Sequence, residues 1–133
     1  MTILFYTHSW LRYLVLLAAL VALVALGYGA LTGRSVTTAR KLSTLFVGLL
    51  DLQAVLGFFL IMNGEYPDAV TGHLILMVFA VIVTHGSYVV GQQVENERVG
   101  LGIRFGGIVA ALVLIVIGIM AISQTVLGYT VLH

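Results

Sequence analysis

One stretch of the chain, from Gly72 to Gln92, runs for 21 residues without Lys, Arg, Asp or Glu. A helix needs about 20 apolar residues to cross the hydrocarbon core of a bilayer, so this stretch is long enough to span a membrane. It carries two histidines, His73 near its start and His85 further along. Ionisable groups inside a membrane are costly and mark functional sites, so these histidines are the clearest functional signal in the chain.

The overall composition agrees with a membrane location. Of the 133 residues, 61% are hydrophobic and only 8% are charged, whereas soluble domains carry about 25% charged residues. The length predicts one transmembrane domain over residues 1–133 with four spans. The chain has no cysteine, which excludes disulfides and thiolate metal sites. A net charge of +1 provides no basic patch for nucleic acid.

The connections between the apolar runs are short, so successive helices are expected to be antiparallel neighbours. The sequence therefore predicts an all-α, integral membrane four-helix up-down bundle. Its spans are expected at residues 8–31, 42–62, 72–92 and 101–123. In the fourth span, Gly102, Gly106 and Ala110 are spaced four apart, and Gly107 and Ala111 repeat the spacing one residue later. Small residues at this spacing predict close helix packing.

The basic residues are distributed unevenly between the two ends of the predicted bundle. Only Arg12 falls at the end that holds the termini. The positive-inside rule therefore places both termini on the outer side of the membrane. The residues that fall on the opposite side are Arg34, Arg40, Lys41, Arg98 and Arg104.

His8 and His73 form the first candidate site. The predicted topology places them at the outer ends of the first and third spans, at depths that agree within a turn, or about 5 Å. These spans are diagonal partners in an up-down bundle, and two imidazoles facing each other there are suited to ligate a haem iron from both faces. Arg12 is expected to pair with a propionate. Alternatively, both histidines are hydrated interfacial residues without a ligand. The side chains expected to contact a porphyrin are Trp10, Tyr13 and Met77.

Asp51 and His85 form the second candidate site, together with Gln53 and Thr84. Both ionisable groups lie a similar distance from the cytoplasmic face, so they are expected to face the bundle interior and to pair. Three functions fit such a pair, namely a proton relay, a hydrogen-bonding site for a quinone, or support of a cofactor. The alternative is a structural hydrogen bond between helices, which contributes about 1 kcal/mol in membranes.

Three segments together resemble small bacterial four-span membrane proteins described as cytochrome b-like. These segments are HSWLRYLVLL from His8, DLQAVLGFFLIM from Asp51, and GHLILMVFAVIVTHGS from Gly72. The resemblance extends from about His8 to Ile122. It implies a four-helix bundle in the bacterial cytoplasmic membrane and a b-type haem, with matching positions at His8, His73 and His85. Where similar sequences often carry a histidine in the second span, this chain has Asp51, which suits hydrogen bonding or proton handling better than iron ligation.

These observations leave two principal hypotheses for function. The first is a redox-associated subunit that holds one haem b between His8 and His73 and passes electrons between a quinone and a partner protein. The second is a cofactor-free accessory subunit of a larger respiratory or photosynthetic membrane complex. Either role implies contact with lipid and with other subunits or a second copy. A proton or solute carrier that uses Asp51 and His85 ranks lower, since no discontinuous helices are evident. No nucleophile elbow, phosphate-binding glycine loop or catalytic carboxylate pair is present, which favours a non-catalytic role.

Overall fold

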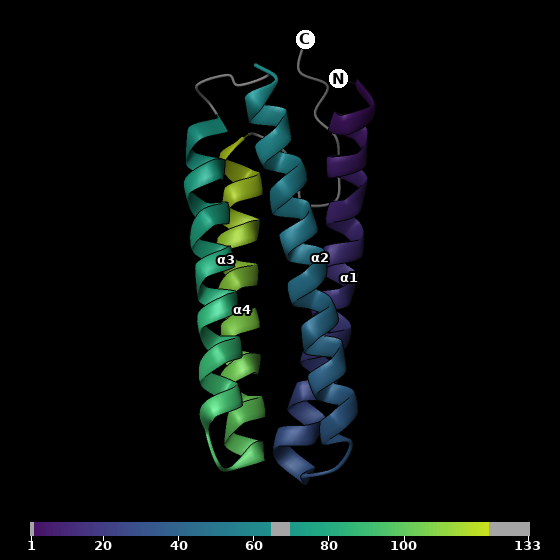
Figure 1. The fold of residues 1–133 in the computed structure, drawn as a ribbon, viewed down its shortest axis with the longest axis vertical. Helices are drawn as coiled ribbons and strands as arrows, with labels where there is room; N and C mark the ends of the chain where they lie inside the picture. The colour runs from purple at the N-terminus through teal and green to yellow at the C-terminus, as the bar shows by residue number, and fades with distance from the viewer. Residues whose placement is uncertain (1, 65–69, 123–133) are drawn as a thin grey trace.

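The computed structural model describes residues 2–64 and 70–122, which form four helices that run alternately up and down (Figure 1). All four are long and apolar enough to cross a membrane. This arrangement confirms the predicted all-α four-helix bundle. Each helix begins before its predicted span, because the polar residues that flank each apolar run continue the helix. The predicted end of the fourth span at Ser123 lies outside the described residues. The helices are α1 (Thr2–Thr32), α2 (Val36–Met62), α3 (Val70–Gln93) and α4 (Glu97–Ala121).

The two ends of the bundle differ in how the helices are joined. We call the end where α1 begins and α4 finishes the terminal end. The opposite end, which carries the connections at residues 33–35 and 94–96, is the hairpin end (Figure 1). The α1–α2 connection turns at Gly33, whose φ of 70° is left-handed and whose N–H donates to the carbonyl of Gly29 at 2.8 Å. Glycine takes up this backbone conformation without the steric cost that a side chain would impose.

Polar contacts fasten the hairpin end. The side chain of Asn96 caps α4 by accepting hydrogen bonds from the backbone N–H groups of Arg98 and Val99, at 3.0 and 3.3 Å. Nε of Arg98 donates to the carbonyl of Ala30 at 2.8 Å, at the last turn of α1. A cation there interacts favourably with the helix dipole. An ion pair between Arg40 and Glu97, at 3.0 Å, links α2 to α4.

Small residues are mixed with large apolar ones in the interior of the bundle, and many large apolar residues face outward. Phe58 and Val24 are among the exposed side chains. This distribution is the reverse of that in a soluble bundle and matches helix packing in lipid, where small interior residues let the backbones approach closely. Fully buried alanines occur on all four helices, namely Ala19, Ala22, Ala39, Ala80 and Ala111.

The four helices do not pack equally. The most extensive contact is between α3 and α4, followed by α1 with α2 and α1 with α4. In contrast, α2 meets α3 only loosely, and α1 and α3 lie across the bundle from each other. The chain therefore consists of two helical hairpins that are joined mainly through α1 and α4.

A row of glycines explains the close approach of α3 and α4. The backbones of Gly91 and Gly100 lie directly against each other, and Gly107 lies against the side chain of Ser87. A Cβ atom at Gly102 or Gly106 would meet nothing within 4 Å. The prediction that these two glycines form a packing face is therefore wrong, because they face outward. The alternative face through Gly107 and Ala111, which are both buried, is confirmed.

Candidate functional site

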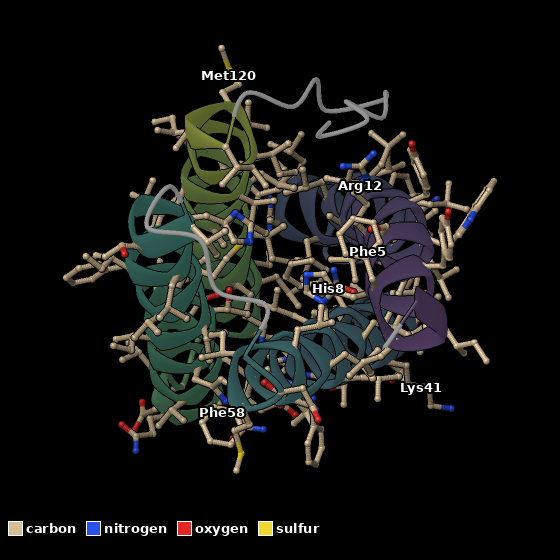
Figure 2. All side chains as sticks on the ribbon, turned by 90° about the horizontal axis from the view of Figure 1, so that it is seen from above. Phe5, His8, Arg12, Lys41, Phe58 and Met120 are labelled. Carbon is tan, nitrogen blue, oxygen red and sulfur yellow. The ribbon has the colours of Figure 1, made fainter. Side chains whose placement is uncertain are left out.

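His8 lies near the terminal end of α1, and its imidazole points into the bundle (Figure 2). Nε2 of Gln53 on α2 donates to the carbonyl oxygen of His8 at 2.8 Å and lies 3.5 Å from Nε2 of the ring. A Cβ atom at Gly57 would lie only 3.1 Å from Cε1 of His8, so the glycine lets the ring lie directly against α2. Within the described part of the chain, the buried Nδ1 of His8 and Oε1 of Gln53 have no hydrogen-bond partner.

His73 lies at the same end of the bundle, on α3. Its Nδ1 donates a hydrogen bond of 3.0 Å to the carbonyl of Gly118 on α4. Because a carbonyl can only accept, the hydrogen sits on Nδ1, and Nε2 of the neutral ring keeps its lone pair. His8 near the start of α1 and His73 near the start of α3 both lie at the terminal end, although α1 and α3 do not pack against each other. The structure thus brings the two histidines to one end of the bundle on opposite helices.

Arg12 lies one turn after His8 on α1 and is almost fully buried. Its Nη2 donates to the hydroxyl of Tyr13 at 2.9 Å, and its guanidinium lies 4.8 Å from the centre of the Tyr13 ring. Trp10 packs against Tyr13 but is 62% exposed on the outside of α1. Trp10 therefore faces outward, whereas His8 points into the bundle. Met77 is partly buried against the core, beside Gly118.

The Asp51–His85 pair links α2 to α3. Nε2 of His85 donates to Oδ1 of Asp51 at 2.8 Å. The side chain of Asp51 is 44% exposed and that of His85 is 45% exposed, so the pair opens to the side of the bundle. The sequence instead predicts that the pair faces the bundle interior. The difference follows from the loose contact of α2 with α3. Gln53 instead joins His8, and the buried Thr84 donates to the carbonyl of Ala80 in its own helix.

The sequence-based reasoning missed the environment of Arg104, which it counted only as a charge near the membrane surface. Arg104 is 5% exposed. Its Nη1 donates to Oγ of Ser43 at 2.8 Å, and its guanidinium lies 4.4 Å from the centre of the Tyr88 ring. Neither of the carboxylate ion pairs seen within residues 2–64 and 70–122 involves Arg104. The feature that could have indicated this burial is the position of Arg104, which lies seven residues into α4, about 10 Å from the start of the helix.

A small cavity lies beside this guanidinium, between α2, α3 and α4. Its volume is about 10 Å³, close to that of a single water site. Four buried or partly buried hydroxyl-bearing residues contribute to its wall, together with Arg104 and two apolar residues. The lining residues are Ser43, Val47, Thr84, Ser87, Tyr88, Arg104 and Ile108.

The donor set in the described helices limits the kinds of cofactor that the bundle can hold. Residues 2–64 and 70–122 contain no group of three or more His, Cys, Asp or Glu side chains that could enclose a metal ion. A haem iron needs only one imidazole from each face, and His8 and His73 supply such a pair from opposite helices. Comparison of the chain with known protein families, with curated proteins and with solved structures finds no match.

Proposed function

We propose that this chain is an electron-transfer subunit of the bacterial cytoplasmic membrane that holds a b-type haem between His8 and His73. The four apolar helices and the basic residues at the hairpin end support insertion as four spans with both termini outside. The bound haem would supply one-electron redox chemistry. The protein's own contribution is to hold the two imidazoles across the bundle and to exclude water around them.

The observation that carries this proposal is the orientation and hydrogen bonding of the two imidazoles. The Gly118 carbonyl fixes the orientation of the His73 ring and leaves Nε2 available as a ligand. A backbone carbonyl on the second nitrogen is the usual support for a metal-binding histidine. The His8 ring points into the bundle with a buried nitrogen that has no partner among the described residues. Both histidines therefore fit the group, and Arg12, one turn from His8, supplies a cation for a propionate.

The first experiment is a visible absorption spectrum of the protein purified from haem-replete cells. We expect a Soret band and a reduced-minus-oxidised difference in the α-band region. His8→Ala and His73→Ala should each lose the low-spin signature of two imidazole ligands, because each removes one axial ligand. The matched control is Asp51→Leu/His85→Phe, which removes a histidine from the same bundle together with its partner carboxylate and should leave the spectrum unchanged. A colourless wild-type protein obtained in full yield would overturn the proposal.

One observation favours a second candidate, the cofactor-free accessory subunit. The amide of Gln53 already ties His8 to α2, so His8 also has a purely structural interpretation. Large apolar side chains exposed on all four helices offer surfaces for partner subunits. Under this alternative, the His8→Ala/His73→Ala double variant should assemble with its partners and support electron flow as the wild type does. Loss of electron flow with assembly intact would reject it.

A further inference from the structure

The Asp51–His85 pair lies near the middle of the helices, far from both ends of the bundle. Asp51 lies 15 residues after the start of α2 and 11 before its end, which corresponds to about 22 and 16 Å along the axis. In a membrane of about 30 Å hydrocarbon thickness, this depth is far from either polar surface. A carboxylate and an imidazole at such a depth are costly unless something polar meets them.

The pair is nevertheless open on the outer side of the bundle. Nearly half of each side chain is exposed, and three exposed apolar residues lie one turn away, Val55 on α2 with Ile82 and Val89 on α3, while the Tyr88 hydroxyl nearby is bonded to Thr44. Gly48, one turn from Asp51 toward the hairpin end, has open space where a side chain would begin. The polar pair thus faces the lipid within an apolar rim, beside a position that lacks a side chain.

The hydrogen bond within the pair determines which chemistry the open side offers. A carboxylate can only accept, so Nε2 of His85 carries the hydrogen that Asp51 receives. In the neutral ring, Nδ1 then holds a lone pair, because the hydrogen bond that the ring makes to the described residues is at Nε2. Asp51 also fixes the ring orientation, as a carboxylate does for a histidine that accepts a proton from a hydroxyl. Nδ1 of His85 is therefore an oriented acceptor for the hydrogen of a hydroxyl group.

We infer that this side of α2 and α3 binds the hydroquinone form of a lipid-soluble quinone, with one ring hydroxyl donating to Nδ1 of His85. Phospholipid headgroups stay at the membrane surface, whereas a hydroquinone on an apolar tail brings hydroxyls into the hydrocarbon region. The apolar rim contacts the ring and the tail, and the space at Gly48 accommodates the ring edge. The inference rests on membrane insertion of the bundle but not on haem, because it uses neither His8 nor His73.

The test uses the full chain in lipid nanodiscs and a decyl-substituted benzohydroquinone as the probe, under anaerobic conditions. Binding is measured against protein-free nanodiscs, which account for simple partition into lipid. We expect saturable binding to the wild type, and weaker binding of the oxidised probe, whose carbonyl oxygens cannot donate to Nδ1. Absence of saturable binding to the wild type would overturn the inference.

Two changes remove the site by different routes. Asp51→Leu/His85→Phe deletes both polar groups together, so that no unpaired group remains in the bilayer, and should weaken binding about tenfold, the equivalent of one lost hydrogen bond. Gly48→Leu leaves the pair intact and fills the adjacent space, with a similar loss expected on steric grounds. Its matched control is Gly102→Leu, an outward glycine on α4 with the same open surroundings, which should bind as the wild type does.

The remaining outcomes separate this site from the haem site and from a protein interface. His8→Ala should keep hydroquinone binding even when it loses the haem spectrum. If Gly48→Leu and Asp51→Leu/His85→Phe, tested separately, both bind the hydroquinone as tightly as the wild type does, the inference is overturned. The chain has no cysteine, so an I82C variant reports on this face alone. Efficient disulfide formation between two I82C copies would assign the face to a second copy of the chain and would also overturn the inference.

Discussion

Arg104 is held by a hydroxyl and an aromatic ring rather than by a carboxylate. Its guanidinium contacts the face of Tyr88, and the Tyr88 hydroxyl in turn shares a 3.1 Å hydrogen bond with Thr44 on α2. A cation over an aromatic face gains about 2 kcal/mol when both groups are removed from water. Arg104 therefore joins three helices at one point, since Ser43 lies on α2 and Tyr88 on α3.

The contribution of the ring can be separated from that of the hydroxyl. Tyr88→Phe keeps the ring and loses the hydrogen bond to Thr44, whereas Tyr88→Leu loses both. We expect Tyr88→Leu to lower the free energy of unfolding by about 1–2 kcal/mol more than Tyr88→Phe. The measurement is unfolding in mixed micelles with increasing SDS. In an Arg104→Leu background the two variants should become equal. Equal losses in the wild-type background would show that the ring does not stabilise the guanidinium.

The residues of the candidate sites were predictable from the sequence to different degrees. His8, His73, Asp51 and His85 stand out because ionisable groups are rare in apolar spans. The partner of Gln53 was not predictable, because it depends on how α2 is rotated about its axis. Side chains two residues apart on a helix point about 200° apart around its axis. Gln53 therefore faces nearly opposite to Asp51 and contacts His8 rather than the Asp51–His85 pair.

At the level of helices, the contact between α3 and α4 depends on which glycine face is turned inward. Adjacent glycines on one helix point about 100° apart. The spacing of small residues indicates two candidate faces on the fourth span, and the pattern does not distinguish them. The structure uses the face through Gly107, because only that face also includes the buried Gly100 and Gly118.

Gly106 and Gly107 make a matched pair for testing this contact. Gly107→Ala should lower the free energy of unfolding by about 1–3 kcal/mol, because a Cβ atom would collide with the side chain of Ser87. Gly106→Ala meets open space and should be neutral or stabilising by about 0.4–1 kcal/mol, since alanine restricts the unfolded chain. SDS-induced unfolding monitored by circular dichroism measures both. Equal effects at the two positions would contradict the observed rotation of α4.

At the level of the whole molecule, the up-down arrangement was predictable because short connections force successive helices to be antiparallel. The unequal packing was not, because all four spans are apolar on every side and the sequence pattern does not indicate which pairs touch most closely. The contact of α1 with α4 joins the two ends of the described chain, and no local pattern reports on it.

The orientation in the membrane can be tested with single cysteines, since the natural chain has none. S35C lies at the exposed hairpin end and N63C at the exposed terminal end. A membrane-impermeant thiol reagent should label N63C in intact spheroplasts and S35C only after the membrane is opened, as expected from the basic residues near Ser35. V24C, within the apolar part of α1, should remain unlabelled in both. The reverse pattern would place the termini inside the cell.

The joining of the two hairpins through α1 and α4 has a consequence for how the protein is made. The α1–α2 hairpin is synthesised before α3 and α4 and can form its own contacts, but its principal partner in the second hairpin is α4, the last of the four described helices to be made. Until then, the interior face of α1 is without that partner, and α3 provides no substitute because it does not touch α1. The two hairpins thus meet only after both have been made. Co-expression of residues 1–64 and 65–133 as separate fragments should therefore restore the bundle. A ribosome stalled before α4 should leave the first hairpin open to capture by membrane insertases or by quality-control proteases.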